Sequence, residues 1–264
     1  MKQRIITGVL AGAIFLALLV LGKVYFDIFI ALLIIIAMQE LFKMAKLQLL
    51  SFEGILATLA ALSLALPVGE KWFGLSLDGG LMLFTVFLFI ILTGMLFSNG
   101  KYSFEDVAFP FLSAFYVGIG FKNLLAARNA GLALVFLALF IVWSTDIGAY
   151  FIGKTFGKRK LLPSVSPNKT VEGSIGGIVS AVIVALIVYF LYKSELPQIG
   201  YFKLILFTII FSIVGQIGDL VESSIKRHFG VKDSGKLLPG HGGILDRFDN
   251  LIFVFPIMHL LGLF

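Results

Sequence analysis

One stretch of the sequence, residues 219–249, concentrates the residue types that carry chemistry. Its carboxylates include two pairs with i, i+3 spacing, Asp219 with Glu222 and Asp246 with Asp249. On a helix this spacing projects both members of a pair from one face. Two such faces, brought together by the loop between them, predict a cup lined by carboxylates, which are the ligands that hard divalent cations such as Mg²⁺ prefer.

Basic residues and glycines surround these acids. The positive side chains are too many to pair with the acids alone, and their excess suits a multiply charged anion such as phosphate. Glycines flank His241 and let the backbone approach a ligand closely, so we expect His241 to contact a ligand. The residues concerned are Lys226, Arg227, Lys232, Lys236, Arg247, Gly240, Gly242 and Gly243.

A purely structural interpretation of the charged residues remains open. Acids that face Lys and Arg at helix ends can form a salt-bridge network that stops a helix from sliding. Glu222 and Asp233 could simply pair with Lys226 or Lys232, and the basic run 158–160 could anchor lipid head groups. For Glu40, which stands in an apolar segment, we expect a surface ion pair with Lys43 or Lys46.

Membrane-spanning helices are the elements that must position these residues. The chain has 264 residues, of which 59% are hydrophobic and 14% charged, and it has no cysteine. Apolar runs of about 20 residues are long enough to cross about 30 Å of hydrocarbon. The composition predicts an all-α, polytopic integral membrane protein and excludes a disulfide framework. The net charge of +6 indicates orientation in the bilayer and attraction to anionic head groups rather than nucleic-acid binding.

About nine transmembrane helices are predicted, with the N-terminus inside and the C-terminus outside. In this topology most of the 21 Lys and Arg residues fall on the inner side. We expect scaffold helices over 1–97 and a catalytic half over 103–264, with cytoplasmic loops at 153–170 and 223–245. The spans are expected near 5–22, 24–42, 52–68, 79–97, 106–125, 131–152, 171–192, 202–222 and 245–264.

The same topology places acids from several spans at one depth near the inner face. Asp146 and Glu172 join the two pairs there. An acid at the centre of a span costs about 2.5–3.5 kcal/mol, and less towards the interface. Such acids must therefore be paired, hydrated or bound to a cation.

Small residues four apart occur in two spans, at Gly8 and Gly12 and at Gly173 and Gly177. This spacing lets helix backbones approach one another. It predicts close helix packing at both places.

The charged stretch resembles the signature of the phosphatidate cytidylyltransferase family, also called CDP-diacylglycerol synthase. Segments 166–173 and 143–150 also look like that family, and the resemblance covers about residues 140–260. The first four spans match only in being hydrophobic. Every position of the signature is met, by Ser223, Ile225, Lys226, Arg227, Lys232, Asp233, Gly235, Leu238, Pro239, His241, Gly242, Gly243, Ile244, Asp246, Arg247, Phe248 and Asp249.

The resemblance implies a reaction in which CTP and phosphatidic acid give CDP-diacylglycerol and pyrophosphate. It implies Mg²⁺, as one or two divalent ions with a second cation as a further option. It also implies a homodimer. We expect a multi-pass protein of the cell inner membrane, and the predicted topology sets the active site on the cytoplasmic side. The metal ligands would be Asp219, Asp246, Asp249 and Asp146; the phosphates would be held by Lys226, Arg227, Lys232 and Arg247; further substrate contacts would come from Ser166, Asn168, Lys169, Ser223, Asp233, His241, Gly242 and Gly243.

Two alternatives stay open. A family member could act on another lipid phosphate, such as an ether-linked or isoprenoid one. In a different class, a cation- or proton-coupled transporter could use the acidic cup as its ion site. That transporter would have acids near mid-membrane and symmetric, broken helices. Here the acids lie to one side, beside basic loops, which favours head-group chemistry.

Overall fold

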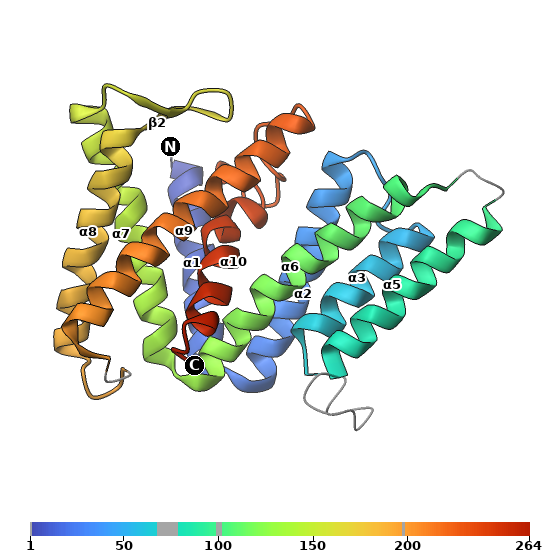
Figure 1. Ribbon diagram of the computed structural model, residues 1–264, viewed down its shortest axis with the longest axis horizontal. Helices are drawn as coiled ribbons and strands as arrows, with labels where there is room; N and C mark the ends of the chain where they lie inside the picture. Colours follow the sequence, from blue (N-terminus) through green and yellow to red (C-terminus); the bar gives the residue numbers. More distant parts are fainter. Residues whose placement is uncertain (1, 68–78, 99–101, 197–198) are drawn as a thin grey trace. The chain divides into compact units, whose positions relative to one another are not determined.

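Helices dominate the structure, a computed structural model that describes residues 2–67, 79–98, 102–196 and 199–264 (Figure 1). The all-α expectation is confirmed. The end of the third predicted span, residue 68, lies outside the described residues. The helices are α1 Lys2–Leu21, α2 Lys23–Met44, α3 Phe52–Ala65, α5 Gly79–Phe97, α6 Phe104–Ala130, α7 Leu132–Phe156, α8 Val171–Leu191, α9 Gly200–His228 and α10 Leu245–Leu260.

Six helices in the described part of the chain are long and apolar enough to cross a membrane. They are α2, α5, α6, α7, α8 and α9. The apolar part of α1 and the whole of α3 are shorter, and α10 has 16 residues. Length and composition therefore support a multi-pass membrane protein with six candidate spans. The predicted total of nine and the N-in/C-out orientation remain predictions.

A β-hairpin occupies much of the loop predicted at 153–170. Helix α7 continues to Phe156, and β1 (Lys160–Leu162) then pairs antiparallel with β2 (Ser166–Thr170). The side chain of Thr170 accepts a hydrogen bond from the Gly173 N–H at 3.1 Å and so caps α8. Hairpin and helix are therefore joined without a flexible linker.

The chain divides into two compact units, Met1–Leu125 with Asp233–Arg247, and Ala126–Lys232 with Phe248–Phe264. The first unit thus includes a late segment of the chain. The predicted division into scaffold helices over 1–97 and a catalytic half over 103–264 stays a prediction. Within this unit α2 packs against α1 and α3, and α3 packs against α5. The ring of Phe84 contacts Phe111 and Phe115, with centroids 5.2 and 6.0 Å apart.

In the second unit α7, α8 and α9 pack together, and α8 approaches α7 closely through its glycines. A methyl group at Gly177 would lie 2.7 Å from the carbonyl oxygen of Thr145, and one at Gly173 would lie 2.7 Å from that of Ala149. The prediction of close packing at Gly173 and Gly177 is confirmed. At Gly12 it is wrong, because a methyl group there would meet nothing within 4 Å.

The contact between α7 and α8 gives a stability prediction with a matched control. Gly177→Ala should lower the apparent melting temperature in detergent, because overpacking against a backbone oxygen costs about 1–3 kcal/mol. Gly12→Ala places the same methyl group in open space and should not lower it. Equal melting temperatures for the two variants would contradict this account of the packing.

Candidate functional site

An ion pair between Lys169 and Asp219 links the two charged segments within the second unit. Lys169 lies in β2 and Asp219 in α9, and the two side chains remain 29% and 27% exposed. Ser223, one turn further along α9, donates its hydroxyl to Asp219 Oδ1 at 3.3 Å. The predicted approach of the first loop to the acids of α9 is therefore present, and the pair stays accessible to a ligand.

Two further carboxylates lie near this pair in the same unit. The carboxylate of Asp249 on α10 interacts electrostatically with the acids Asp219 and Asp146 and with the ammonium group of Lys226. Asp146 on α7 accepts hydrogen bonds from Nδ2 of Asn250 at 3.0 and 3.3 Å, and the backbone N–H of Asn250 donates to Asp249 Oδ1 at 2.9 Å. Three of the four predicted metal ligands therefore lie in one unit and within electrostatic range of one another.

A glycine explains how α9 and α10 come this close. A methyl group at Gly218 would lie 2.5 Å from the carbonyl oxygen of Asp249 and 3.0 Å from the ring of Phe253. Any side chain at this position would push the two helices apart. The residue directly after Gly218 is Asp219, so the contact sets the two acids on neighbouring helices beside one another.

A buried ion pair lies one turn further along α9. Glu222 and Lys226 are joined with i, i+4 spacing, and they are only 1% and 8% exposed. The pairing expected as an alternative for Glu222 is therefore present. Because two charges are expensive to remove from water, each depends on the other for compensation.

Arg227 fastens the end of α9 to the hairpin. Its Nε donates to the carbonyl oxygen of Val165 at 3.4 Å and its Nη1 to that of Val231 at 3.1 Å. At the base of the hairpin, Glu172 accepts the backbone N–H groups of Lys158 and Arg159 at 3.0 and 3.1 Å. Both side chains shape the loop that carries Lys169. Of the other predicted site residues here, Ser166 is half-buried, and Asn168 and Lys232 are exposed.

Asp246, the fourth predicted metal ligand, lies in the first unit and binds its own loop. Its Oδ2 accepts the backbone N–H of Ser234 at 2.9 Å, the Ser234 hydroxyl at 2.9 Å and the Gly243 N–H at 2.8 Å. Gly242 has a φ of 83°, and a methyl group there would overlap the same carboxylate oxygen. The predicted close backbone approach is therefore present, but its partner is a carboxylate of the protein. The neighbouring Asp233 and Arg247 are exposed.

The prediction for Glu40 is wrong. Its side chain does not form a surface ion pair; the residue is 6% exposed and accepts hydrogen bonds from the Ser234 hydroxyl and from the N–H groups of Ile244 and Leu245. The donors lie about 200 residues further along the chain. The spacing of residues around Glu40 in the sequence could not predict that they contact α2.

His241 belongs to the same loop and lies against α1. A methyl group at Gly8 would come within 2.7 Å of its Nε2. The small residue at Gly8 thus accommodates a side chain of this loop, and His241 stays half-buried as a candidate ligand contact.

Sequence reasoning did not single out Ser234 or Asn250. Both lie in or next to the charged stretch and are buried, at 4% and 6% exposure. A single serine or asparagine in a sequence does not by itself indicate a functional role. For Glu40 a signal did exist, because an acid within an apolar helix is rarely left without a specific partner.

The carboxylates of the second unit suit a hard divalent cation in their donor chemistry. As folded, Asp219 is paired with Lys169 and Asp146 is bound by Asn250. Among the described residues, no three acidic or histidine side chains already converge in a metal-binding arrangement. A metal would therefore compete with these internal partners.

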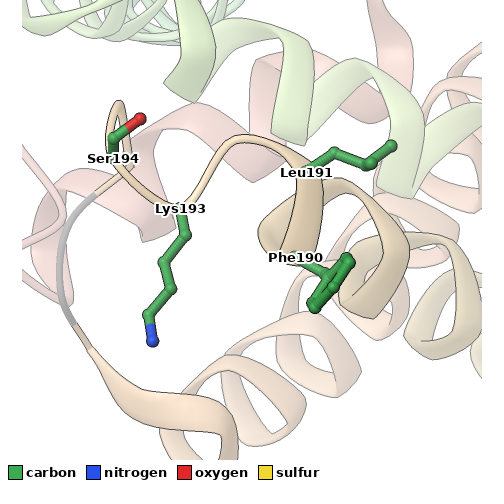
Figure 2. A pocket seen from close by; sticks show the side chains of 4 residues that line it. All are labelled: Phe190, Leu191, Lys193 and Ser194. Carbon is green, nitrogen blue, oxygen red and sulfur yellow. The ribbon is translucent and has the colours of Figure 1, made fainter.

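A separate pocket lies at the opposite end of α8 (Figure 2). Phe190 and Leu191 line it from the last turn of the helix, and Lys193 and Ser194 line it from the segment that follows. A helix of 21 residues is about 30 Å long. The pocket is therefore too far along α8 to belong to the cluster around Lys169.

Fold and site together define a helical membrane protein with acidic and basic groups gathered at helix ends. The model of the Cytidylyltransferase family matches residues 2–264, and the chain belongs to this family. It is similar to the phosphatidate cytidylyltransferase of Bacillus subtilis (strain 168), with 47% identity over 100% of this chain and 98% of the relative. The enzymes of that name from Staphylococcus haemolyticus and Staphylococcus aureus (strain COL) are 44% and 42% identical, over 99% of this chain and 98% of each relative.

The contact between Asn250 and Asp146 can be tested by exchanging donor and acceptor. Asn250→Asp would set a carboxylate against Asp146 and Asp249, and it should lower the apparent melting temperature because a buried polar group left without a partner costs about 1–3 kcal/mol. Adding Asp146→Asn should restore much of the loss. The same change at an exposed position, Asn168→Asp, is the control. A fully stable Asn250→Asp protein would contradict the contact.

Proposed function

We propose that this protein transfers the cytidylyl group of CTP to phosphatidic acid, giving CDP-diacylglycerol and pyrophosphate. The observation that carries the proposal is family membership along residues 2–264, together with relatives named phosphatidate cytidylyltransferase that align over nearly their whole length. The cluster of acidic and basic groups supports it, because the reaction brings two polyanions together.

The chemistry asks the protein mainly for positioning and charge compensation. An oxygen of the lipid phosphate attacks the α-phosphorus of CTP, and the bond from that phosphorus to pyrophosphate breaks. The attacking phosphate is already ionised, so no strong general base is needed. Lys169, on the hairpin, and Lys226 and Arg227, near the end of α9, are proposed to hold phosphate oxygens and so align the reacting groups.

We also propose that Mg²⁺ takes part, held in the second unit by Asp219 and Asp249 with Asp146. When bound, it would neutralise phosphate charge. The role of Asp246 as a metal ligand stays a prediction. Its Oδ2 accepts hydrogen bonds from the backbone N–H groups of Ser234 and Gly243 in the first unit.

The remaining proposals concern the setting of the reaction. We propose a multi-pass protein of the cell inner membrane with nine spans, N-in and C-out, and with the site on the cytoplasmic side. There a lipid head group and soluble CTP can meet without crossing the bilayer. A homodimer is proposed from the family resemblance alone.

The direct test is pyrophosphate release by purified protein in detergent, given CTP, Mg²⁺ and phosphatidic acid. We expect release only when all three are present, loss of release with a chelator, and recovery on adding Mg²⁺. A panel of ether-linked and isoprenoid phosphates would identify a different lipid substrate. Folded protein that releases nothing with any of these lipids or with other nucleotides would refute the proposal.

Asp219 is the residue whose replacement should separate catalysis from folding. Asp219→Asn should lower kcat by about 100-fold or more, because it removes a charge from the proposed metal site. Stability should change little, since an ion pair that is partly exposed to solvent contributes about 0–1 kcal/mol. The control is Glu105→Gln, at an exposed acid of α6. Wild-type turnover in Asp219→Asn would exclude the metal-ligand role.

A further inference from the structure

We infer that Glu40 of α2 is a positioning residue for the proposed reaction. Its buried carboxylate fixes the segment 233–247, here called the signature loop, and thereby orients Asp246. The catalytic part of this inference rests on the proposed function. The structural part concerns contacts within the first unit alone.

Both oxygens of the Glu40 carboxylate are engaged by the loop. Oε1 accepts the N–H of Ile244 at 2.8 Å, and Oε2 accepts the N–H of Leu245 at 3.0 Å and the hydroxyl of Ser234 at 2.9 Å. The two backbone donors belong to the start of α10, where N–H groups have no partner within the helix. The carboxylate therefore supplies hydrogen-bond acceptors for the N–H groups at this end of α10. Glu40 lies 204 positions before Ile244 in the sequence.

The loop also closes tightly around the carboxylate. Methyl groups at Gly235 or Gly243 would both overlap the Glu40 side chain. Glycine at these two positions lets the backbone approach the acid closely. The close packing of the loop around Glu40 allows only this arrangement of the loop. A flexible ion pair at the surface would not restrict the loop in this way.

Ser234 connects Glu40 with Asp246. Its hydroxyl oxygen lies 2.9 Å from Glu40 Oε2 and 2.9 Å from Asp246 Oδ2, and its backbone N–H also donates to Asp246 Oδ2 at 2.9 Å. A hydroxyl carries one hydrogen, so it can donate to one carboxylate at a time. When the hydroxyl donates to Glu40 Oε2, the backbone N–H of Ser234 still donates to Asp246 Oδ2. Ser234 therefore links the two acids, and the orientation of Asp246 depends on where Glu40 holds the loop.

A role in packing alone would not call for an acid at position 40. The neighbours of Glu40 on α2, Ala37, Met38 and Leu41, are buried and apolar. An acid in such a helix is costly unless its partners are supplied by the protein. What the acid adds is a single hydrogen-bonded arrangement of the loop. Displacing reacting groups by about 1 Å can cost about 100-fold in rate.

The test combines kinetics with a probe of the loop. The chain contains no cysteine, so Leu237→Cys, at a loop position that is 54% exposed, can carry a single nitroxide spin label. Thr155→Cys, at an exposed position of α7, provides a labelled site outside the loop. Each labelled protein is compared with and without Glu40→Ala, Glu40→Asp and Gln39→Ala, the last being an exposed neighbour on the same helix.

We expect Glu40→Ala to mobilise the label at position 237 but not at 155, and to lower kcat/KM by about 100-fold. Glu40→Asp, which keeps the charge, should recover part of both properties. Gln39→Ala should change neither.

Three results would overturn the inference. They are an unchanged label at 237 in Glu40→Ala, equal mobilisation at 237 and 155, and a mobilised loop with undiminished kcat/KM. If the wild-type protein itself releases no pyrophosphate, the proposed function fails. The label at 237 then still decides whether Glu40 holds the loop.

Discussion

A carboxylate in a membrane-spanning helix must find its hydrogen-bond donors within the protein, because hydrocarbon offers none. This constraint governs each unit separately. In the first, Glu40 gathers the Ser234 hydroxyl and two backbone N–H groups. In the second, Glu222 is compensated by Lys226 within α9. Since an unpaired buried charge would be strongly destabilising, the segment that supplies the partners of Glu40 is held beside α2.

Hydrogen bonds and ion pairs within each unit also set the positions of the charged loops. The hairpin of the second unit is joined to α8 by the Thr170 cap, closed by Glu172 and fastened to α9 through Arg227 and the Lys169–Asp219 pair. In the first unit the signature loop is fixed through Glu40 and lies against α1 at Gly8. Loops that bind multiply charged substrates need such support. Charged groups that are already in position stabilise the transition state without having to rearrange first.

The sequence predicts the helices well, because an apolar run of fixed minimum length is a local property. The family resemblance also sets Lys169 of the first loop in the same site as Asp219, and the two residues form an ion pair. Sequence reasoning fails at Glu40, because the donors lie some 200 residues further along the chain. It does not reveal that the glycines at 242 and 243 approach acids of the protein itself, nor that Asn250 serves Asp146. Each of these contacts is set by tertiary packing, which spacing in one sequence does not encode.

The signature, although continuous in sequence, contributes to both units. Residues 233–247 fold with the N-terminal helices, whereas 223–232, Phe248 and Asp249 fold with the helices after Leu125. Within the first unit, the N-terminal helix α2 thus also binds the signature through Glu40. A fragment that began after Leu125 would keep the Lys169–Asp219 pair and the contact of Asn250 with Asp146. It would leave the N–H groups of Ile244 and Leu245 without the carboxylate that accepts them. The signature by itself connected the first spans with the family only through their hydrophobicity, but the family model covers them too. In the first unit they contribute one acid, Glu40, whose partners lie in the signature.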